Sequence, residues 1–192
     1  MYVSPIMLAE MSDPNGSGGV RVLHEAIERA GVPVRKIWSG DRLQVGSGVV
    51  MRVFHPPEQG VIGSDNANSI TVAVEYAGRR LLLPGDLESP GIENVMAEQP
   101  YDCDILLAPH HGSRRSDPPG FAAWSSPEWV VVSGGGGDEI EHVTKTYERA
   151  GARVLATINS GTIAFQVAEG AALNVKTWHN DASLVDVADR RP

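Results

Sequence analysis

The sequence predicts a mixed α/β fold, in which strands and helices share one hydrophobic core. Its first half is rich in short alternating segments separated by tight-turn residues, which is typical of hairpins. Its second half alternates apolar strand segments with helical ones, which is typical of sheets covered by helices. The chain has 192 residues, 42% of them hydrophobic and 21% charged, as expected for one ordinary globular domain.

One helix and several strands are predicted in the first half. Residues 20–30 carry apolar side chains at helical spacing, and Gly31 follows as a stop. The other elements alternate polar and apolar residues between turns that contain Gly, Pro or Asp. These predicted strands cover 1–8, 32–38, 42–45, 49–54, 70–76 and 79–83, and the last two form a hairpin through Ala77-Gly78.

The second half is predicted to alternate buried strands with helices. The apolar runs at 104–108 and 128–132 are short and unbroken, as in strands covered on both faces. Helices are expected over 91–97, 120–124 and 142–150, and closing strands over 153–158, 162–167 and 174–178. Residues 1–180 are expected to form the domain, and residues 181–192 a flexible charged tail.

Charge and cysteine content narrow the classes of function. The formal net charge of −8 argues against broad electrostatic binding of nucleic acid, but not against a metal enzyme, because bound cations invert the local field. Cys103 is the single cysteine, so the chain has no internal disulfide and no Cys-rich zinc site. Without a membrane-length apolar run or a signal-peptide pattern, the chain taken alone is expected to be soluble.

Two apolar runs end abruptly at residues that can bind metal. Residues 81–83 lead into Pro-Gly-Asp86, and residues 105–108 lead into Pro-His110-His111-Gly-Ser. Side chains at the ends of such strands build active sites in open α/β folds, and Asp with His suits zinc, manganese or iron. Because neighbouring strand residues face opposite sides, at most one of the two histidines is expected to bind metal directly. The other is expected to hydrogen-bond to ligands or substrate.

Simpler interpretations of the individual residues stay open. Asp86 alone could be a turn residue, and Asn68, just before a strand, could cap its own loop. His142 follows the glycine run 134–137 at a predicted helix start, and is a metal ligand or an ordinary first-turn residue. Arg114 directly follows the histidine motif, where it could meet a phosphate or simply be solvated.

Four stretches, in order, resemble the metallo-β-lactamase-like domain at the C-terminus of ComEC-type DNA-uptake (competence) proteins. They are the Asn-rich approach to a strand at 66–70, the strand end with Gly-Asp at 81–88, the His-His-Gly-Ser motif at 104–113, and a closing pattern at 130–133, His142 and 157–163. The resemblance covers most of residues 1–178 and implies an αβ/βα sandwich.

The resemblance also implies a metal centre of two divalent ions, zinc or manganese, between the layers. Asp86 would bridge the ions, and His110 and His142 would each help to hold one. Asp86 and His110 would be catalytic. The residues implied to contact substrate are His111, Ser113, Asn68 and Arg114.

The first metal motif of the family, of the form His-x-His/Asp-x-Asp-His, is absent from this sequence. We therefore expect an N-terminally truncated, partial sandwich that lacks its first strands, holds one metal ion or none, and hydrolyses weakly or not at all. Glu141-His142-Val143 also departs from the His-Pro pair that the family more often has, which puts the role of His142 in doubt. A sheet without its first strands exposes an edge, so self-association is expected too.

Three functions remain open. The first is part of a metal-dependent phosphodiesterase or nuclease-like domain acting on DNA, beside the transmembrane channel portion of its parent protein. In the family this domain is attached to the membrane and is thought to lie outside the cytoplasm. The second is a non-catalytic scaffold or binding module that kept the fold and lost the metal, which the missing motif and the charge of −8 favour. The third is a hydrolase of the same superfamily that acts on a small molecule.

Overall fold

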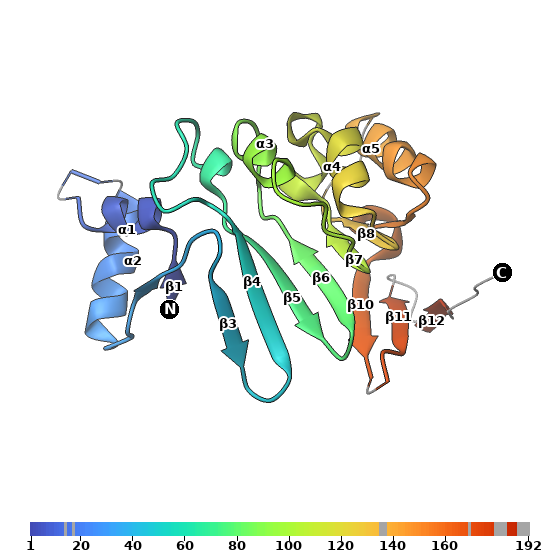
Figure 1. Cartoon of the computed structure of the whole chain (residues 1–192), viewed down its shortest axis with the longest axis horizontal. Coiled ribbons are helices and arrows are strands. Elements are labelled where there is room, and N and C mark those ends of the chain that lie inside the picture. The colour runs from blue at the N-terminus through green and yellow to red at the C-terminus, as the bar shows by residue number, and fades with distance from the viewer. Residues whose placement is uncertain (14, 17, 135–137, 169, 179–183, 188–192) are drawn as a thin grey trace.

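A seven-stranded mixed sheet is the largest feature of the computed structural model, which describes residues 1–13, 15–16, 18–134, 138–168, 170–178 and 184–187. The strands follow one another in space as in sequence (Figure 1). β3 to β6 pair antiparallel, and β6 to β9 pair parallel. The strands are β3 (Arg42–Val45), β4 (Val49–His55), β5 (Thr71–Tyr76), β6 (Arg79–Leu83), β7 (Ile105–Leu107), β8 (Trp129–Val132) and β9 (Arg153–Ala156). The predicted α/β fold is thus confirmed.

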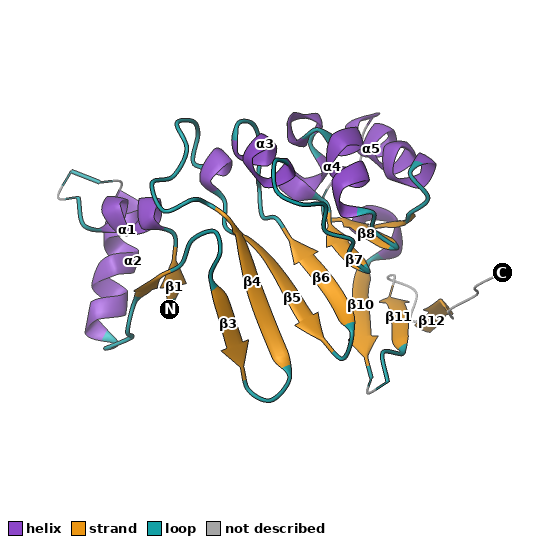
Figure 2. Ribbon diagram, viewed as in Figure 1, coloured by secondary structure: helices purple, strands orange, loops and turns teal. Residues whose placement is uncertain are grey.

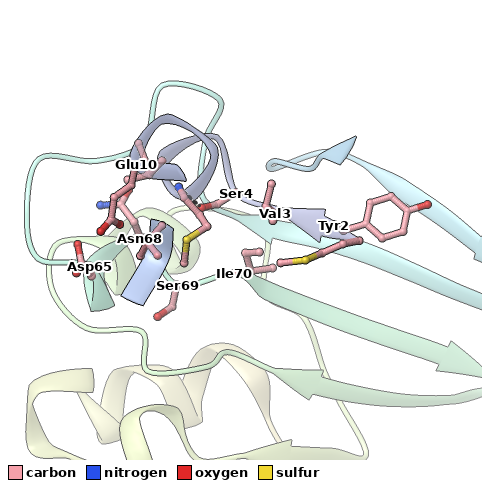
Figure 3. A pocket seen from close by; sticks show the side chains of 12 residues that line it. Tyr2, Val3, Ser4, Glu10, Asp65, Asn68, Ser69 and Ile70 are labelled. Atoms are coloured by element: carbon pink, nitrogen blue, oxygen red, sulfur yellow. Dashed lines mark hydrogen bonds between the residues drawn. The ribbon is translucent and has the colours of Figure 1, made fainter. Parts of the chain in front are cut away.

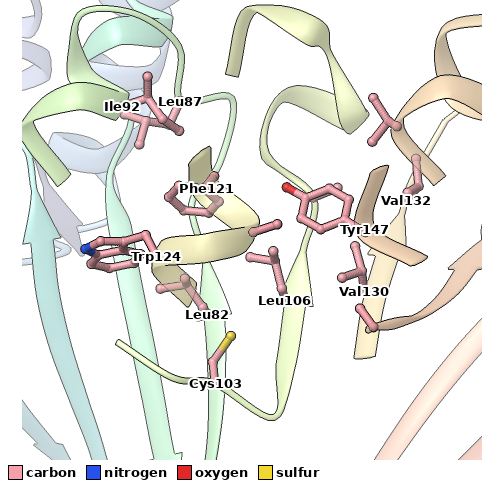
Figure 4. Close-up of a cluster of buried hydrophobic side chains, with 14 of the residues drawn as sticks. Leu82, Leu87, Ile92, Cys103, Leu106, Phe121, Trp124, Val130, Val132 and Tyr147 are labelled. Carbon is pink, nitrogen blue, oxygen red and sulfur yellow. The ribbon is translucent and has the colours of Figure 1, made fainter. Parts of the chain in front are cut away.

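Helices in the parallel crossovers cover one face of this sheet (Figure 2). They are α3 (Gly91–Met96), α4 (Pro118–Ser125) and α5 (Asp138–Arg149). Together they build the main core, because one face of the central strands and the inner faces of the helices are fully buried (Figure 4). The fully buried side chains of this core include Leu82, Leu106 and Val130 from the strands, and Ile92, Phe121 and Tyr147 from the helices.

A smaller antiparallel sheet packs on the opposite face. It has the order β10 (Thr162–Val167), β11 (Leu173–Trp178), β12 (Leu184–Val187). Phe165 packs edge-on against Trp129, with ring centroids 6.0 Å apart, and Val175 joins the same cluster. Side chains alternate along a strand, so Trp129 points away from its buried neighbour Val130 and needs this second cover.

The expected tail is partly a strand. Leu184–Val187 pairs with β11 in a regular antiparallel register, with Val187 opposite Val175. The alternation Leu-Val-Asp-Val suits such pairing. The rest of the predicted tail, residues 181–183 and 188–192, lies outside the described residues.

The prediction for the N-terminal segment is wrong beyond its first residues. Only β1 (Tyr2–Val3) is a strand, paired in parallel with β2 (Arg35–Lys36). It gives way to α1 (Pro5–Met11), which Ser4 caps by accepting a hydrogen bond from the Met7 amide at 3.1 Å. Ser followed by Pro is a helix-start signal, and it outweighs the strand-like apolar composition. α2 (Gly18–Arg29) agrees with the predicted helix at 20–30.

Short helices fill the remaining connections. They are η1 (Asn66–Asn68), η2 (Pro109–Gly112), η3 (Arg114–Ser116) and α6 (Thr157–Ser160). α6 shortens the strand predicted over 153–158, and α5 begins at Asp138, earlier than the predicted start at His142. Within the part of the chain that the structure describes, no helix is long and apolar enough to cross a membrane.

The imidazole of His55 links fold stability to pH. It is 1% exposed at the end of β4, and its Nε2 donates to the Ala67 carbonyl at 2.8 Å. Burial lowers the pKa of His55, and the hydrogen bond to Ala67 opposes this only in part. The unfolded chain therefore takes up the proton first, so stability present above about pH 6.5 is lost as the pH falls towards the folded-state pKa.

We accordingly expect the melting temperature to drop between about pH 7.5 and about pH 5.5, and His55→Gln to drop less over that interval. His24→Gln is the matched control, because His24 is partly exposed on α2, with its Nε2 3.5 Å from a carboxylate oxygen of Glu28. Thermal melts in matched buffers measure the effect. An unchanged pH dependence in His55→Gln would remove His55 as its cause.

Candidate active site at the ends of three parallel strands

Two of the three residues predicted to bind metal, Asp86 and His110, lie at one edge of the sheet. Asp86 follows β6, His110 and His111 follow β7, and Ser133 follows β8. These three strands are parallel neighbours, so their carboxyl ends meet at the same edge. The expected convergence of Asp86 with the histidines is therefore observed.

The backbone at the two histidines is left-handed. His110 has φ 48° and ψ 48°, His111 has φ 56° and ψ 23°, and Gly112 follows with φ 83°. Such a conformation costs about 1–3 kcal/mol for a non-glycine residue, and it persists only where the surroundings hold it. Here the His110 amide donates to the Gly85 carbonyl at 3.0 Å. The divergence of the two side chains thus comes from this strained turn, and not from strand alternation as expected.

His111 connects Asp86 to Ser133. Its Nδ1 lies 2.9 Å from the Ser133 carbonyl oxygen and 3.1 Å from the Ser133 Oγ. A carbonyl only accepts, so Nδ1 carries a proton, and in the neutral ring Nε2 keeps a free lone pair. That Nε2 lies 3.5 Å from Asp86 Oδ1, and both side chains are about half exposed, at 62% and 47%. A ligand could reach them from solvent.

His110 turns inward to a second carboxylate, Glu88. Its Nδ1 lies 3.3 Å from Glu88 Oε2, and both atoms are buried without a well-aligned hydrogen bond. The other oxygen of Glu88 accepts a hydrogen bond from Ser64 Oγ at 2.6 Å. Buried polar atoms without partners are costly, so a shared proton or a bound cation would relieve this pair.

Both contacts fit metal ligation in kind and spacing. An ion that holds nitrogen and oxygen at about 2.1 Å in tetrahedral geometry sets those ligand atoms about 3.4 Å apart. The Asp86–His111 and Glu88–His110 separations lie close to that value. Each contact supplies two donors, however, and no group of three His, Cys, Asp or Glu suited to a metal occurs among the described residues.

The other predicted site residues do not join this group. His142 is exposed on α5, where its backbone carbonyl accepts from Thr146 Oγ1 at 2.9 Å. Ser113 caps η3 by accepting from the Arg115 amide at 3.3 Å, and Arg114 is exposed in that turn.

The side chain of Asn68 forms hydrogen bonds within its own loop. It is 8% exposed, its Oδ1 accepts from the Val61 amide at 2.8 Å, and its Nδ2 donates to the carbonyls of Val61 and Ser64. These hydrogen bonds agree with the simpler interpretation of Asn68 as a loop cap, and its contact with substrate stays a prediction. It also lines a cavity of about 530 Å³ between the N-terminal helices and the start of β5 (Figure 3). Ser69, on the same wall, lies 3.4 Å from where a Cβ on Gly85 would stand, so the cavity adjoins the turn of Asp86.

Sequence reasoning missed three residues of this site. Glu88 belongs to the same motif as Asp86, and a second carboxylate two residues after the first was the available signal. Ser133 directly follows an apolar strand segment, and Asp86 and the histidines stand within three residues of the end of theirs. This shared position after a strand was the available signal for Ser133. Ser64 gave no signal, because it reaches Glu88 only through the folded loop.

Comparison with known proteins agrees with the predicted resemblance. Over 149 residues, 74% of the chain, it is 31% identical to ComE operon protein 3 of Bacillus subtilis (strain 168). Over 129 residues, 64% of the chain, it is 30% identical to competence protein ComA of Neisseria gonorrhoeae. The chain is homologous to part of these competence proteins. It spans 19% and 18% of their lengths, about a fifth of each.

Other comparisons add little to this relation with competence proteins. No family model matches the chain. A crystal structure from Parabacteroides distasonis ATCC 8503, named for a metal-dependent hydrolase, superimposes with a TM-score of 0.46 at 16% identity, covering 69% of this chain and 60% of that one. The fold is defined by the chain's own sheet topology.

Gly112 is expected to be indispensable to the histidine turn. A Cβ there would lie 3.0 Å from Val132 and 3.3 Å from Val143, at a positive φ. Gly112→Ala should lower the free energy of unfolding by about 2 kcal/mol or more, from backbone strain and overpacking together. Urea unfolding measures this change. Gly19→Ala on α2, where nothing lies within 4 Å, is the matched control and should be neutral or mildly stabilising. Equal effects at the two positions would contradict the packing argument.

Proposed function

We propose that this chain is a metal-dependent phosphodiesterase domain of the ComEC type, acting on DNA. The observation that carries the proposal is the meeting of two imidazole–carboxylate contacts at the ends of three parallel strands, in a chain homologous to competence proteins. The partners expected from the resemblance, DNA and a transmembrane channel portion, belong to this proposal, as does a position outside the cytoplasm.

Asp86 and His111 are the metal ligands that the geometry favours. The Ser133 carbonyl fixes the tautomer of His111, so its free nitrogen lone pair lies towards the Asp86 carboxylate. The resemblance implied His110 and His142 beside Asp86 in place of His111, and Asp86 with these two histidines remains the competing ligand set. When bound, a divalent ion would lower the pKa of a water molecule and polarise a phosphodiester oxygen.

Glu88 and His110 have the arrangement of an oriented acid–base pair. The buried carboxylate faces Nδ1 of His110, and Ser64 holds that carboxylate in place. An imidazole oriented in this way can give or take a proton at its other nitrogen. Arg114, exposed beyond the histidines, adds a positive charge that a phosphate could meet.

A non-catalytic binding module is the second candidate. Its supporting observation is that each imidazole–carboxylate contact offers a metal only two ligand atoms, and no group of three potential ligands occurs among the residues the structure describes. Two protein donors hold a divalent ion weakly, so hydrolysis would be slow or absent. The two candidates differ in one measurable property, which is metal affinity.

Metal binding to Asp86 and His111 is directly testable. We expect Mn²⁺ or Zn²⁺ titration calorimetry to show binding by the unaltered chain, and Asp86→Asn and His111→Gln to weaken it at least about tenfold. His142→Gln is the control, and should bind as the unaltered chain does. A Mn²⁺-dependent assay on single-stranded DNA should lose activity in the same two variants.

Three other results would each change the conclusion. Loss of binding in His142→Gln and not in His111→Gln would favour the ligand set implied by the resemblance. Metal binding without cleavage would remove the phosphodiesterase proposal but keep the site. No binding by the unaltered chain would favour the non-catalytic module.

A further inference from the structure

A second feature lies at the opposite end of the same strands. A groove of about 580 Å³ crosses the start of β4, the end of β5 and the start of β6, at their lower ends in Figure 1. We call it the arginine groove and define it by Val50, Arg52, Glu75, Tyr76, Arg80 and Tyr101. Arg80 precedes Asp86 by six residues, so extended chain places the two within about 20 Å of each other.

Positive charge exceeds negative charge within this groove. Glu75 is the carboxylate on its wall, and it lies 3.7 Å from Arg52 and 3.8 Å from Arg42, just outside the groove. The guanidinium of Arg80 donates to the Asp102 carbonyl at 3.0 Å. Two guanidinium groups therefore lie beside Glu75, and a third, that of Arg80, lines the same groove.

Two further carboxylates near the groove form ion pairs with Arg79. Asp104 lies 2.6 Å and Glu128 3.4 Å from its guanidinium, so these carboxylates offset a different arginine. Asp104 also accepts the backbone amide of Arg80, which fixes the start of β6. Arg42 and Arg52 thus share one carboxylate, Glu75, and with Arg80 they leave a local excess of positive charge.

Aromatic rings hold two of these arginines in place. The guanidinium of Arg52 lies 5.3 Å from the ring centre of Phe54 and 5.4 Å from that of Tyr101. Arg80 lies 5.4 Å from the same Tyr101 ring. Stacking orders a guanidinium plane but leaves its N–H edge free for paired hydrogen bonds to a phosphate.

Two tyrosines complete the groove in different ways. Tyr101 is 6% exposed and donates its hydroxyl to Glu75 at 3.0 Å. Burial, and then the hydrogen bond to Glu75, raise the pKa of Tyr101, so the hydroxyl stays a donor. Tyr76 is 37% exposed and lines the groove, so part of its ring is accessible to solvent.

We propose that the arginine groove binds the phosphodiester backbone of single-stranded nucleic acid. Ordered guanidinium edges match phosphate oxygens, and a partly exposed tyrosine ring in the groove lining matches an unstacked base. An acidic peptide would meet the arginines but leave Tyr76 without a role. In a chain of net charge −8, a local excess of arginine favours binding of a polyanion at this groove. The inference goes beyond the metal site and holds whether or not that site is active.

The test measures binding apart from catalysis. The probe is a labelled thymidine oligonucleotide of about 12 nucleotides, followed by fluorescence anisotropy at about 50 mM salt. An Asp86→Asn background in EDTA removes any contribution from metal. Arg52→Gln and Arg80→Gln should each weaken binding about fivefold, and the logarithm of affinity should fall with the logarithm of salt with a slope of about −2.

Three further variants sharpen the result. Arg29→Gln on α2 removes the same charge far from the groove and should change binding less than about twofold. Glu75→Gln removes the negative charge on the groove wall and should strengthen binding. Tyr76→Ala changes no charge and should weaken binding if a base stacks there.

Two outcomes would overturn the proposal. One is equal binding by the Arg29, Arg52 and Arg80 variants, provided that their melting temperatures match. The other is displacement of the oligonucleotide by polyglutamate of equal charge with no effect of Tyr76→Ala, which would point to an acidic protein partner. Oligonucleotide binding without metal-dependent cleavage would support the groove and count only against the phosphodiesterase.

Discussion

The alignment of three parallel strands under one layer of helices is the constraint on which the rest of this structure depends. Leu82, Leu106 and Val130 stand side by side in the registers of β6, β7 and β8, and all three are fully buried. Each such burial is worth about 1.5–3 kcal/mol. A slip of one residue would turn the whole row to the other face, so the register is strongly fixed. Because it is fixed, Asp86, the two histidines and Ser133 meet at one edge.

The turn that carries His110 and His111 has a strained backbone, which the rigid sheet beneath it holds in place. Two histidines in left-handed conformations are unfavourable by themselves, yet the Gly85 carbonyl and the close packing of Gly112 against Val132 and Val143 hold the turn. The result is two imidazoles that diverge, His111 towards solvent and Asp86, His110 towards buried Glu88. A relaxed helix or strand at this place would not send neighbouring side chains to two different carboxylates.

The two ends of the sheet carry different electrostatics. The carboxyl ends of β6 to β8 combine carboxylates with imidazoles, as metal sites do. The opposite ends of β4 to β6 combine arginines with aromatic rings around Glu75. The five residues of β6 join the two ends of the sheet. The excess of arginine in the groove gives a physical reason why an acidic chain could still act on a polyanion.

The sequence by itself determined most of the element types, because apolar periodicity and turn residues act locally. It places β3, β6 and β10 at their observed bounds and names Asp86, His110 and His111 as neighbours of one site. It missed α1, where a Ser-Pro cap competes with apolar composition. It left Asn68 as either a loop cap or a substrate contact, and the structure shows the hydrogen bonds of the loop cap.

Only the tertiary structure decided which imidazole meets which carboxylate, and that Ser64, Glu88 and Ser133 belong to the site. It alone gathered Arg42, Arg52 and Arg80, which stand on three different strands. The reason is that contacts between side chains of different strands depend on strand register and on the left-handed histidine turn. The local pattern of residues predicts neither of these.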